Sequence, residues 1–522
     1  MWQQSYWLHG TERPDMKGYF WPSKATCLEA DAVIIGSGAG GASVADVLTA
    51  AGLSVVMLEE GKHITSSSAS QVATDAFSMA WRSAGISAAI GRPAITYAEG
   101  RCVGGGTEIN SAIAQRADVD LIEQWRKLNK IKDFTPESLA PYFERAERAV
   151  NASLTPGPLG GPTEILRQGS DALGWKVSEL KRGQRGCKGA NRCSYICPTG
   201  AKQSMAVTLL PKAVERGMRL LARTRVDRIR FKKGRATEVL GRSVDPAGGQ
   251  AAPVRVRAGM VFVCAGAIQT PALLRYSGLR EGIGNTLRLH PTIKATVLFN
   301  ERLDAHLSRL PLTAVTEFMP EQRIGGSVFT PPIFGLSLAE DWNNRGNLMQ
   351  NWRFCGSYYG MIRARGVGAV RLIPGTKEPL VSFKLTPEDW IALGQVLTRL
   401  GQAMFAAGAR KVFPSIFGHE GWTSPDQVYE FWNKPLPSAT DLMTVHLFSS
   451  CPLNEHENAC GVDSYGRVRG IENLFVADAS LIPEAPGVNP QMTIMALAFR
   501  VAEAALSRSS GERARSAARE RV

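Results

Sequence analysis

The sequence predicts a protein that is α/β in a first, Rossmann-like domain and α+β overall, with a second domain that is mostly antiparallel sheet. Three observations predict this fold class. An apolar run, a glycine-rich turn, an apolar helical pattern and a second apolar run follow one another after residue 30. The middle of the chain alternates extended apolar stretches with loops and has no such turn. The C-terminal part returns to strand, turn and helix signals.

The first element is a βαβ unit over Asp31–Gly61. Its G-x-G-x-x-G glycines and the acid that ends the second strand are Gly36, Gly38, Gly41 and Glu59. The first glycine permits a tight turn, the second lets a pyrophosphate approach the backbone, and the third lets the helix pack close to the strand. The carboxylate of Glu59 can accept hydrogen bonds from a ribose diol. The unit therefore predicts an unphosphorylated adenosine dinucleotide, NAD or FAD, without separating the two.

Composition bounds the class of protein. The chain has 522 residues, which predicts two or more domains, and it has no apolar run long enough to cross a bilayer. The net charge is +14, partly in a basic tail over 508–522, but no nucleic-acid-binding motif accompanies it. The N-terminal residues lack the pattern of a signal peptide, so we expect no export signal in this chain. Nine cysteines, an odd number, argue against a disulfide framework.

A second glycine loop lies at Gly104–Gly106 and leads into a helix through Thr107 and Asn110. Three consecutive glycines indicate close approach of the backbone to a ligand, or a loop that needs positive φ angles. With the first glycine motif and Glu59, the segment GRCVGGGTEIN resembles the FAD-binding motifs of the glucose-methanol-choline (GMC) oxidoreductases, and in particular the cholesterol-oxidase-like members.

Two further segments carry the resemblance. VFVCAGAIQTPALLRYSGL, from Val261, and the C-terminal VADASLIPEAPGVNPQMTIMALA are similar to family signatures. The resemblance implies the GMC fold and non-covalent FAD, because no histidine occurs between His63 and His290 to attach it. It implies cofactor contacts from Gly36, Gly38, Ala39, Gly41, Glu59, Gly105, Gly106, Asn110, Ala112, Val226, Ala265, Asp478, Ala479, Pro490 and Gln491.

A cysteine-rich loop over 187–205 contains Cys187, Cys193 and Cys197 in the spacing C-x5-C-x3-C-P. Such a run is typical of iron–sulfur ligands, and it suits zinc less well because structural zinc sites prefer four ligands. Reduced structural thiols remain the alternative. The run also resembles the cysteine segment of the FAD-dependent sugar dehydrogenases of the GMC family, which implies a [3Fe–4S] cluster that takes electrons from reduced FAD.

The predicted domains follow from these motifs. An FAD-binding domain covers 28–291, a substrate-binding domain covers 292–440, and the chain returns to the FAD-binding domain over 441–507 before the basic tail. Extended stretches are predicted at Leu220–Phe231, Gly259–Ala265 and Ile293–Phe299, and a helix at Pro387–Ala407. Aromatic and sulfur-containing side chains of the middle domain, such as Tyr359, could line a pocket.

The predicted catalytic residues are His446 and Asn489, which match the His–Asn pair of the family signature. An imidazole can accept a hydroxyl proton near neutral pH, and an amide can stabilise the developing alkoxide. His290 is interpreted as a structural residue or one that acts through others. The prediction is therefore oxidation of a CH–OH group by hydride transfer to flavin N5, with the cluster passing electrons to a cytochrome or quinone.

Two other functions stay open from the sequence. One is an FAD-only alcohol oxidase that uses dioxygen and has structural cysteines, and the other is a GMC-type lyase or photodecarboxylase. The expected partners are an alcohol or sugar substrate and, by the resemblance, a small subunit with an export signal and a cytochrome c. Either cytoplasmic residence or co-export to the periplasm fits, and no nucleic-acid partner or transmembrane segment is expected.

Overall fold

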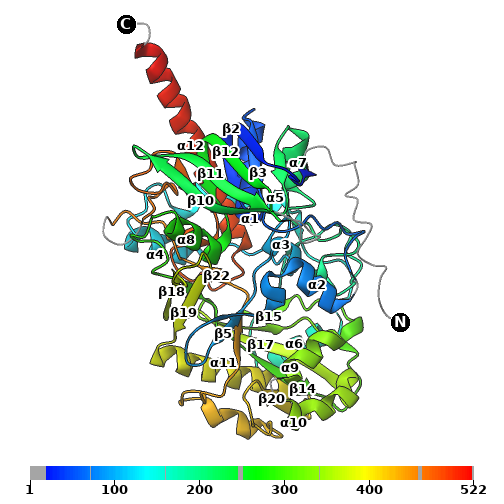
Figure 1. The fold of residues 1–522 in the computed structure, drawn as a ribbon. Coiled ribbons are helices and arrows are strands. Elements are labelled where there is room, and N and C mark those ends of the chain that lie inside the picture. The colour runs from blue at the N-terminus through cyan, green and yellow to red at the C-terminus, as the bar shows by residue number, and fades with distance from the viewer. Residues whose placement is uncertain are drawn as a thin grey trace.

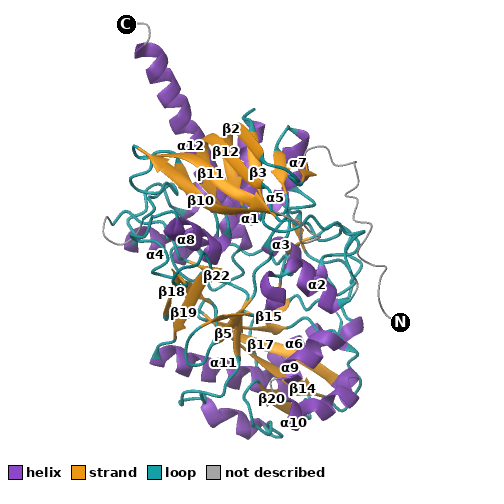
Figure 2. Ribbon diagram, viewed as in Figure 1, coloured by secondary structure: helices purple, strands orange, loops and turns teal. Residues whose placement is uncertain are grey.

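The computed structural model describes residues 19–519 apart from residues 71, 159, 245–250, 340 and 457–460. Two β-sheets lie in opposite halves of the molecule, and helices and long loops connect and cover them (Figures 1 and 2). One sheet is largely parallel and the other is mostly antiparallel. The predicted fold class, a Rossmann-like domain with a second, mostly antiparallel domain, is therefore confirmed.

The first sheet has eight strands in the order β1-β9-β3-β2-β12-β11-β10, and β23 pairs with β12. These strands are β1 (Tyr19–Phe20), β2 (Thr26–Ile35), β3 (Val55–Leu58), β9 (Arg219–Leu221), β10 (Thr224–Lys232), β11 (Arg235–Ser243), β12 (Pro253–Val263) and β23 (Leu474–Val476). Strand β2 pairs in parallel with β3 and β12. Its last four residues are buried, as expected for a central strand of a parallel sheet with both faces covered.

One predicted strand of this sheet differs in the structure. The stretch predicted as Leu220–Phe231 forms two strands, β9 and β10, because the chain turns at Arg223, which has a φ angle of +51°. Strand β9 pairs in parallel with β3, whereas β10 pairs antiparallel with β11. Because of this turn, the two parts of the segment pair with different strands, β9 with β3 and β10 with β11.

The second sheet has nine strands, and several come from outside the middle of the chain. Its strands are β4 (Ser87–Ala89), β5 (Ile95–Tyr97), β7 (Val177–Glu179), β14 (Thr292–Leu298), β15 (Thr313–Val315), β16 (Gln322–Gly326), β17 (Cys355–Ile362), β20 (Lys411–Pro414) and β21 (Leu442–Thr444). Strands β4, β5 and β7 precede residue 292 and β21 follows residue 440, so segments far apart in sequence close this sheet.

Helices pack on both sheets. The α-helices are α1 (Ala39–Ala50), α2 (Ala73–Ala80), α3 (Gly106–Ile109), α4 (Val119–Leu128), α5 (Pro136–Ala149), α6 (Gly161–Ala172), α7 (Leu209–Glu215), α8 (Gly266–Tyr276), α9 (Pro331–Ala339), α10 (Trp342–Arg345), α11 (Pro387–Ala406) and α12 (Gln491–Arg519). Helix α12 lies against α1 and α5, and α11 lies against β17 and α6. A capping box at Thr386 precedes α11, which begins at Pro387 as predicted and ends one residue before the predicted end at Ala407.

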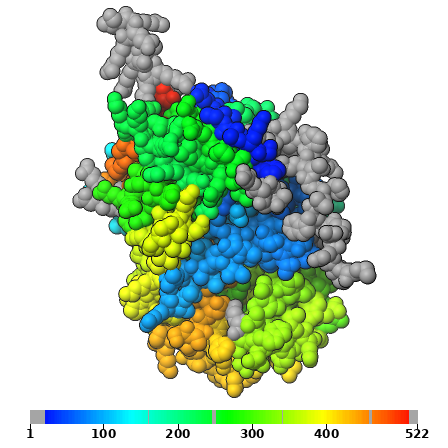
Figure 3. Space-filling view, viewed as in Figure 1, coloured from blue at the N-terminus to red at the C-terminus, as the bar shows by residue number. Residues whose placement is uncertain are grey.

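Three short pairings complete the strands: β6 (Ala152–Ser153) with β8 (Arg182–Gly183), β13 (Arg288–Leu289) with β22 (Leu447–Phe448), and β18 (Val367–Leu372) with β19 (Pro379–Lys384). In the space-filling view, the blue segment that contains α2, β4 and β5 lies across the waist between the two halves (Figure 3). Among the residues that the structure describes, none of the helices is long and apolar enough to cross a membrane.

Candidate active site

A cavity of about 940 Å³ contains both groups of predicted site residues. The residues predicted to contact the cofactor line its wall, apart from Gly41, which lies behind the first glycine turn. His446 and Asn489 line the same cavity. Its size is at the upper end of the range for cofactor and ligand sites, so it can hold a dinucleotide next to a substrate.

The two glycine loops touch at one end of this cavity. Gly36 has a φ angle of +99°, and a Cβ there would lie 2.4 Å from the backbone oxygen of Cys264. A Cβ on Gly105 would lie 2.9 Å from the Cα of Gly38, whereas a Cβ on Gly38 itself would meet no atom within 4 Å. The backbone at Gly38 is therefore open to a ligand at the N-terminus of α1, where unpaired N–H groups and the helix dipole favour a phosphate.

Glu59 lies in the floor of the cradle at the end of β3. Its Oε2 accepts hydrogen bonds from the backbone N–H and the hydroxyl of Ser37 at 3.0 and 2.7 Å, and its Oε1 accepts one from Gly61 N–H at 2.8 Å. Burial raises the pKa of this carboxyl despite those donors. Each oxygen still has a lone pair, so the carboxyl can accept a hydrogen bond from a ribose hydroxyl.

The remaining cofactor residues join segments that are distant in sequence. Asn110 Nδ2 donates to Gln491 Oε1 at 2.7 Å, which connects the second glycine loop to the start of α12. Asp478 Oδ2 accepts from Gly266 N–H at 2.9 Å and fixes the turn before α8. These contacts hold three segments of the chain around one cavity.

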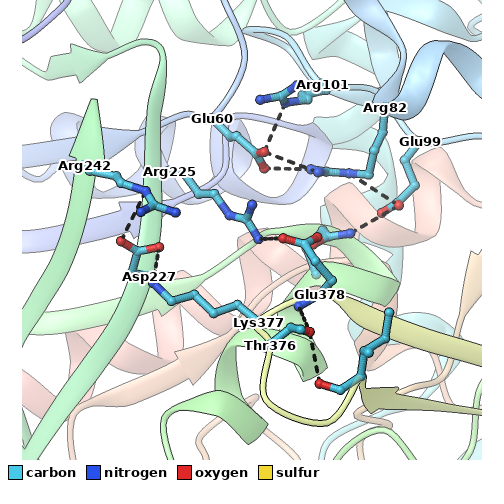
Figure 4. A network of polar contacts seen from close by, with 12 residues as sticks. Glu60, Arg82, Glu99, Arg101, Arg225, Asp227, Arg242, Thr376, Lys377 and Glu378 are labelled. Atoms are coloured by element: carbon cyan, nitrogen blue, oxygen red, sulfur yellow. Dashed lines mark hydrogen bonds and ion pairs between the residues drawn. The ribbon is translucent and has the colours of Figure 1, made fainter. Parts of the chain in front are cut away.

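A network of ion pairs lies at the other end of the glycine cradle (Figure 4). Glu60 accepts from Arg82 at 2.8 Å and lies 3.0 Å from the Nε of Arg101, and Arg82 also faces Glu99 at 3.5 Å. Burial alone would raise the pKa of Glu60, but the charge of Arg82 lowers it to about 2. This half of the network is therefore ionised and internally paired.

The same network continues to the loop between β18 and β19. Arg225 of β10 lies 2.8 Å from Glu378, and Lys377 lies 2.8 Å from Asp227. Arg225, Asp227 and Lys377 line the cavity. Two ion pairs thus connect the β18–β19 loop to strand β10 (Figure 4). Val226, the predicted adenosine contact, lies between Arg225 and Asp227 in sequence and lines the same cavity.

The predicted catalytic residues meet at the cavity wall. His446 Nε2 lies 3.0 Å from Asn489 Nδ2. On the far side of Asn489, its Oδ1 accepts a hydrogen bond from Arg323 at 2.7 Å. On the far side of His446, its Nδ1 lies 3.0 Å from Nδ1 of His290, whose Nε2 accepts from the N–H of Gly487 at 3.0 Å.

This chain of contacts has a donor at each end, Arg323 beside Asn489 and Gly487 N–H beside His290. A guanidinium and a backbone N–H can only donate, and two neutral imidazoles already carry one ring proton each. Burial, followed by the charge of Arg323, lowers the pKa of His446 to about 3. Burial and the neighbouring His446 and Arg323 lower the pKa of His290 as well. Both imidazoles are therefore neutral over the physiological range.

The three predicted metal ligands line a second, small cavity of about 20 Å³. Arg182 Nη2 lies 3.1 Å from the Sγ of Cys193, and buried Lys202 donates to the backbone oxygen of Cys193 at 2.8 Å. Burial acts against ionisation of Cys197, but a hydrogen bond from Thr199 lowers its pKa. Within the described part of the chain, however, no group of three or more His, Cys, Asp or Glu side chains is placed to hold a metal ion. The thiols are close together but do not form a ready ligand set.

The sequence did not identify three groups at this site. Arg323 lies on β16, whose sequence QRIGG carries no motif. Glu60 follows the predicted Glu59 directly, and its pairing with Arg82 could not be read from spacing. His290 was predicted to be structural or to act through other residues, but its partner could not be predicted, because its contact with His446 spans 156 residues.

A dinucleotide cradle that opens onto an imidazole and an amide is the arrangement of a dinucleotide-dependent oxidoreductase. Two models of the GMC oxidoreductase family match the chain, over residues 29–292 and 365–498. A GMC-type oxidoreductase of Sinorhizobium fredii, which is itself uncharacterized, is 77% identical over 506 residues, covering 97% of this chain and 100% of that protein. This chain therefore belongs to the GMC oxidoreductases, and the family supports FAD as its cofactor.

More distant proteins are similar over most of the chain. A long-chain-alcohol oxidase of Arabidopsis thaliana is 25% identical over 516 residues, covering 90% of this chain and 67% of that protein. The structure of a formate oxidase variant of Aspergillus oryzae has a TM-score of 0.71 at 15% identity, covering 94% of this chain and 100% of that chain. A pyridoxine 4-oxidase structure has a TM-score of 0.66 at 18% identity, covering 91% and 98%. At this identity the two structures show the shared fold.

Proposed function

We propose that this protein oxidises a CH–OH group with FAD, and that His446 and Asn489 carry out the proton chemistry. The observation that carries the proposal is the 3.0 Å approach of His446 Nε2 to Asn489 Nδ2 at the wall of the cavity. A substrate oxygen that lies beside the pair, within hydrogen-bond distance of both nitrogens, can accept a hydrogen bond from the amide and release its proton to the imidazole. FAD, when bound, supplies the hydride acceptor.

The residues around the cavity fit FAD. The open backbone at Gly38 and the loop at Gly105 would hold the pyrophosphate, and Glu59 would accept hydrogen bonds from the ribose. The contacts of Asn110 and Asp478 support the loops on either side of the cavity. These residues bind and orient the cofactor, and the walls of the cavity limit access of water to the reacting groups.

An apolar alcohol is the substrate class that the cavity favours over a sugar. Ile86 and Leu336 line the cavity and are 85% and 61% exposed, and Phe77 and Ile333 line it as well. Large exposed apolar side chains at a binding cavity indicate an apolar ligand. The similarity to a long-chain-alcohol oxidase supports the same class. A sugar, with a hydroxyl on most carbons, would leave these side chains without a matching surface.

The electron acceptor has two candidates. Dioxygen is supported by the relatives named as oxidases and by the lack of a ready metal site among the described residues. A [3Fe–4S] cluster on Cys187, Cys193 and Cys197 is supported by their spacing and by the two buried cations beside their shared cavity. Buried positive charge stabilises thiolates and an anionic cluster.

One set of measurements tests function and acceptor together. Protein purified without oxygen is examined for flavin absorbance, iron content and electron paramagnetic resonance, and is then mixed with 1-dodecanol, cholesterol or glucose. We expect bleaching of the flavin by an apolar alcohol and none by glucose, with loss of bleaching in H446Q. Hydrogen peroxide formed in air by iron-free protein assigns dioxygen as acceptor, whereas about three iron atoms per chain assign the cluster. Colourless protein would contradict the proposal.

A further inference from the structure

Arg323 is a buried charge on strand β16. The residue lies on β16 directly opposite Met361 of β17, and Met361 lines the cavity. Residues directly opposite each other in an antiparallel pair project on the same face of the sheet, so Arg323 lies on the face toward the active site. Its side chain is 1% exposed. Among the residues that the structure describes, none of the ion pairs includes it.

The hydrogen bonds of this guanidinium are incomplete. One terminal nitrogen donates to both Gln115 Oε1 at 2.6 Å and Asn489 Oδ1 at 2.7 Å. Within the described residues, its Nε and its other terminal nitrogen have no hydrogen-bond acceptor. An arginine buried in this way is costly unless the site uses its charge. The two acceptors it does have lead directly to the catalytic pair.

The contact with Asn489 determines which way the amide faces. A guanidinium N–H can only donate, so the atom of Asn489 that it meets must be the carbonyl oxygen. The amide nitrogen then faces His446 Nε2 at 3.0 Å. If Asn489 were rotated by half a turn, its NH₂ group would meet the guanidinium and its oxygen would meet the imidazole. Asn489 could then no longer donate to a substrate oxygen.

The charge acts in the same direction as the hydrogen bond. Drawing electron density toward Asn489 Oδ1 strengthens the opposite N–H as a donor, because linked hydrogen bonds polarise one another. The charged and titratable groups that face His446 are Arg323 and His290. Arg323 disfavours an imidazolium at His446.

We propose that Arg323 is a positioning residue for alcohol oxidation: through Asn489 it aims the amide N–H at the substrate oxygen and keeps His446 unprotonated. The assignment rests on the proposed function of this site. When the hydroxyl proton moves to His446 Nε2, the growing negative charge on the substrate oxygen faces an amide donor whose far side is held by a cation. Arg323 remains protonated throughout, since a guanidinium does not release a proton in this range.

The test compares R323M, R323K and a matched control. R323M keeps an apolar side chain of similar length and removes the charge and the donors. R323K keeps the charge but not the planar geometry. Arg345 on α10 is also buried, at 4% exposed, and is paired with Asp341 instead of contacting the catalytic residues. R345M therefore reports the general effect of removing a buried arginine from the same domain.

Two measurements are made on each flavin-containing variant. The first is kcat/KM for an alcohol as a function of pH. In R323M we expect a loss of about 30-fold or more at pH 7 and an acidic limb shifted upward by about one pH unit or more, with R323K recovering the limb but only part of the rate. The second, which needs no turnover, follows the titration midpoint of His446 by ¹³C NMR of labelled histidine, assigned with H446Q. The midpoint should rise in R323M and not in R345M.

The outcomes separate this inference from the proposed function. If alcohols are not oxidised but the His446 midpoint rises in R323M, the proposed function fails and the role of Arg323 on His446 stands. If alcohols are oxidised and R323M keeps the rate, the pH limb and the midpoint of the parent protein, the inference about Arg323 is wrong. Should R323M fail to hold flavin, R323K decides in its place: a rate and pH limb equal to those of the parent protein would overturn the geometric part of the assignment.

Discussion

Substitution by alanine should have different effects at two glycines of the first turn, lowering FAD affinity at Gly38 and protein stability at Gly40. At Gly38 the backbone has a φ angle of −67°, which alanine can adopt, and the new methyl group would meet no protein atom within 4 Å. At Gly40 the new methyl group would lie 1.9 Å from the backbone oxygen of Ala477, which belongs to the segment after β23. G38A therefore tests the cofactor contact, whereas G40A tests the packing of α1.

The magnitudes follow from these distances. For G38A the apoprotein should be within about 1 kcal/mol of the parent protein, because no contact is lost and alanine restricts the unfolded chain. Its methyl group would occupy the space in which the pyrophosphate approaches the backbone, so FAD affinity should fall by about 100-fold, or about 2.7 kcal/mol. For G40A the overlap forces the helix or the Ala477 segment to move, which costs about 1–3 kcal/mol of stability.

Thermal denaturation of the apoprotein and titration with FAD, followed by quenching of flavin fluorescence, measure the two effects. G335A is the control, because a Cβ there meets nothing within 4 Å and Gly335 lies inside α9. This control should gain up to about 1 kcal/mol and bind FAD normally. FAD affinity of G38A within about threefold of the parent protein would refute the placement of the cofactor in this cradle. A melting temperature of G40A equal to that of the parent would refute the packing argument.

Three further predictions concern other parts of the site. The pKa of His446 is lowered to about 3 in the folded protein, whereas a histidine in the unfolded chain has a pKa near 6.5. Between pH 6.5 and pH 3, the unfolded chain therefore binds a proton at this residue that the folded chain does not bind. Stability is therefore lost as pH falls below about 6.5, by up to about 2 kcal/mol at pH 5 from this group, and the melting temperature of H446Q should fall less from pH 7 to pH 5 than that of the parent. Glu378 is 53% exposed in its pair with Arg225, so E378Q should change stability by less than about 1 kcal/mol. It should nevertheless speed FAD release, which stopped-flow fluorescence would measure; 1 M NaCl should have the same effect on the parent and little on E378Q, and equal salt effects on both would contradict a role of the pair. L336S should raise KM for 1-dodecanol about tenfold and leave KM for 1-butanol unchanged, and an equal rise for both alcohols in steady-state assays would place Leu336 outside the path of the alkyl chain.

The βαβ unit could be predicted because its signals are local. The apolar run before Gly36, the glycine spacing and the run that ends at Glu59 lie within 31 successive residues, and β3 ends directly before Glu59. The same holds for α11, whose start is marked by Thr386 and Pro387. These elements depend on side chains that are neighbours in sequence, so a single sequence contains the information.

For the second sheet, the sequence predicted that it is mostly antiparallel but not which strands pair. Strand β21 pairs with β5 in parallel, which brings Leu442 beside Ile95 across more than 300 residues. Nothing in either short segment specifies the other, because each has three residues and a generic apolar pattern. Which short strands pair depends on how the whole core packs, and the sequence of one short segment does not specify its distant partner.

In the cysteine loop, the spacing of the cysteines predicts that they lie close together but not how their thiols are oriented. The C-x5-C-x3-C run places Cys187, Cys193 and Cys197 around one small cavity, as a shared site requires. Spacing does not fix the direction of each thiol, and a φ angle of +69° at Ile196 changes the path of the chain between the second and the third cysteine. Proximity therefore follows from the sequence, whereas coordination geometry does not.

The two ends of the cavity differ in whether their charged side chains are paired with opposite charges, and this difference indicates where the chemistry occurs. At the adenosine end, Glu60 pairs with both Arg82 and Arg101, and Arg82 also faces Glu99, so the charged groups there have partners of opposite sign. At the other end, Arg323 is buried beside Asn489 with two nitrogens unsatisfied among the described residues. Such a charge is best stabilised when negative charge develops nearby, and the substrate oxygen acquires that charge only during proton loss to His446. The position of the uncompensated cation and the position of the base thus point independently to the same few ångströms of cavity wall.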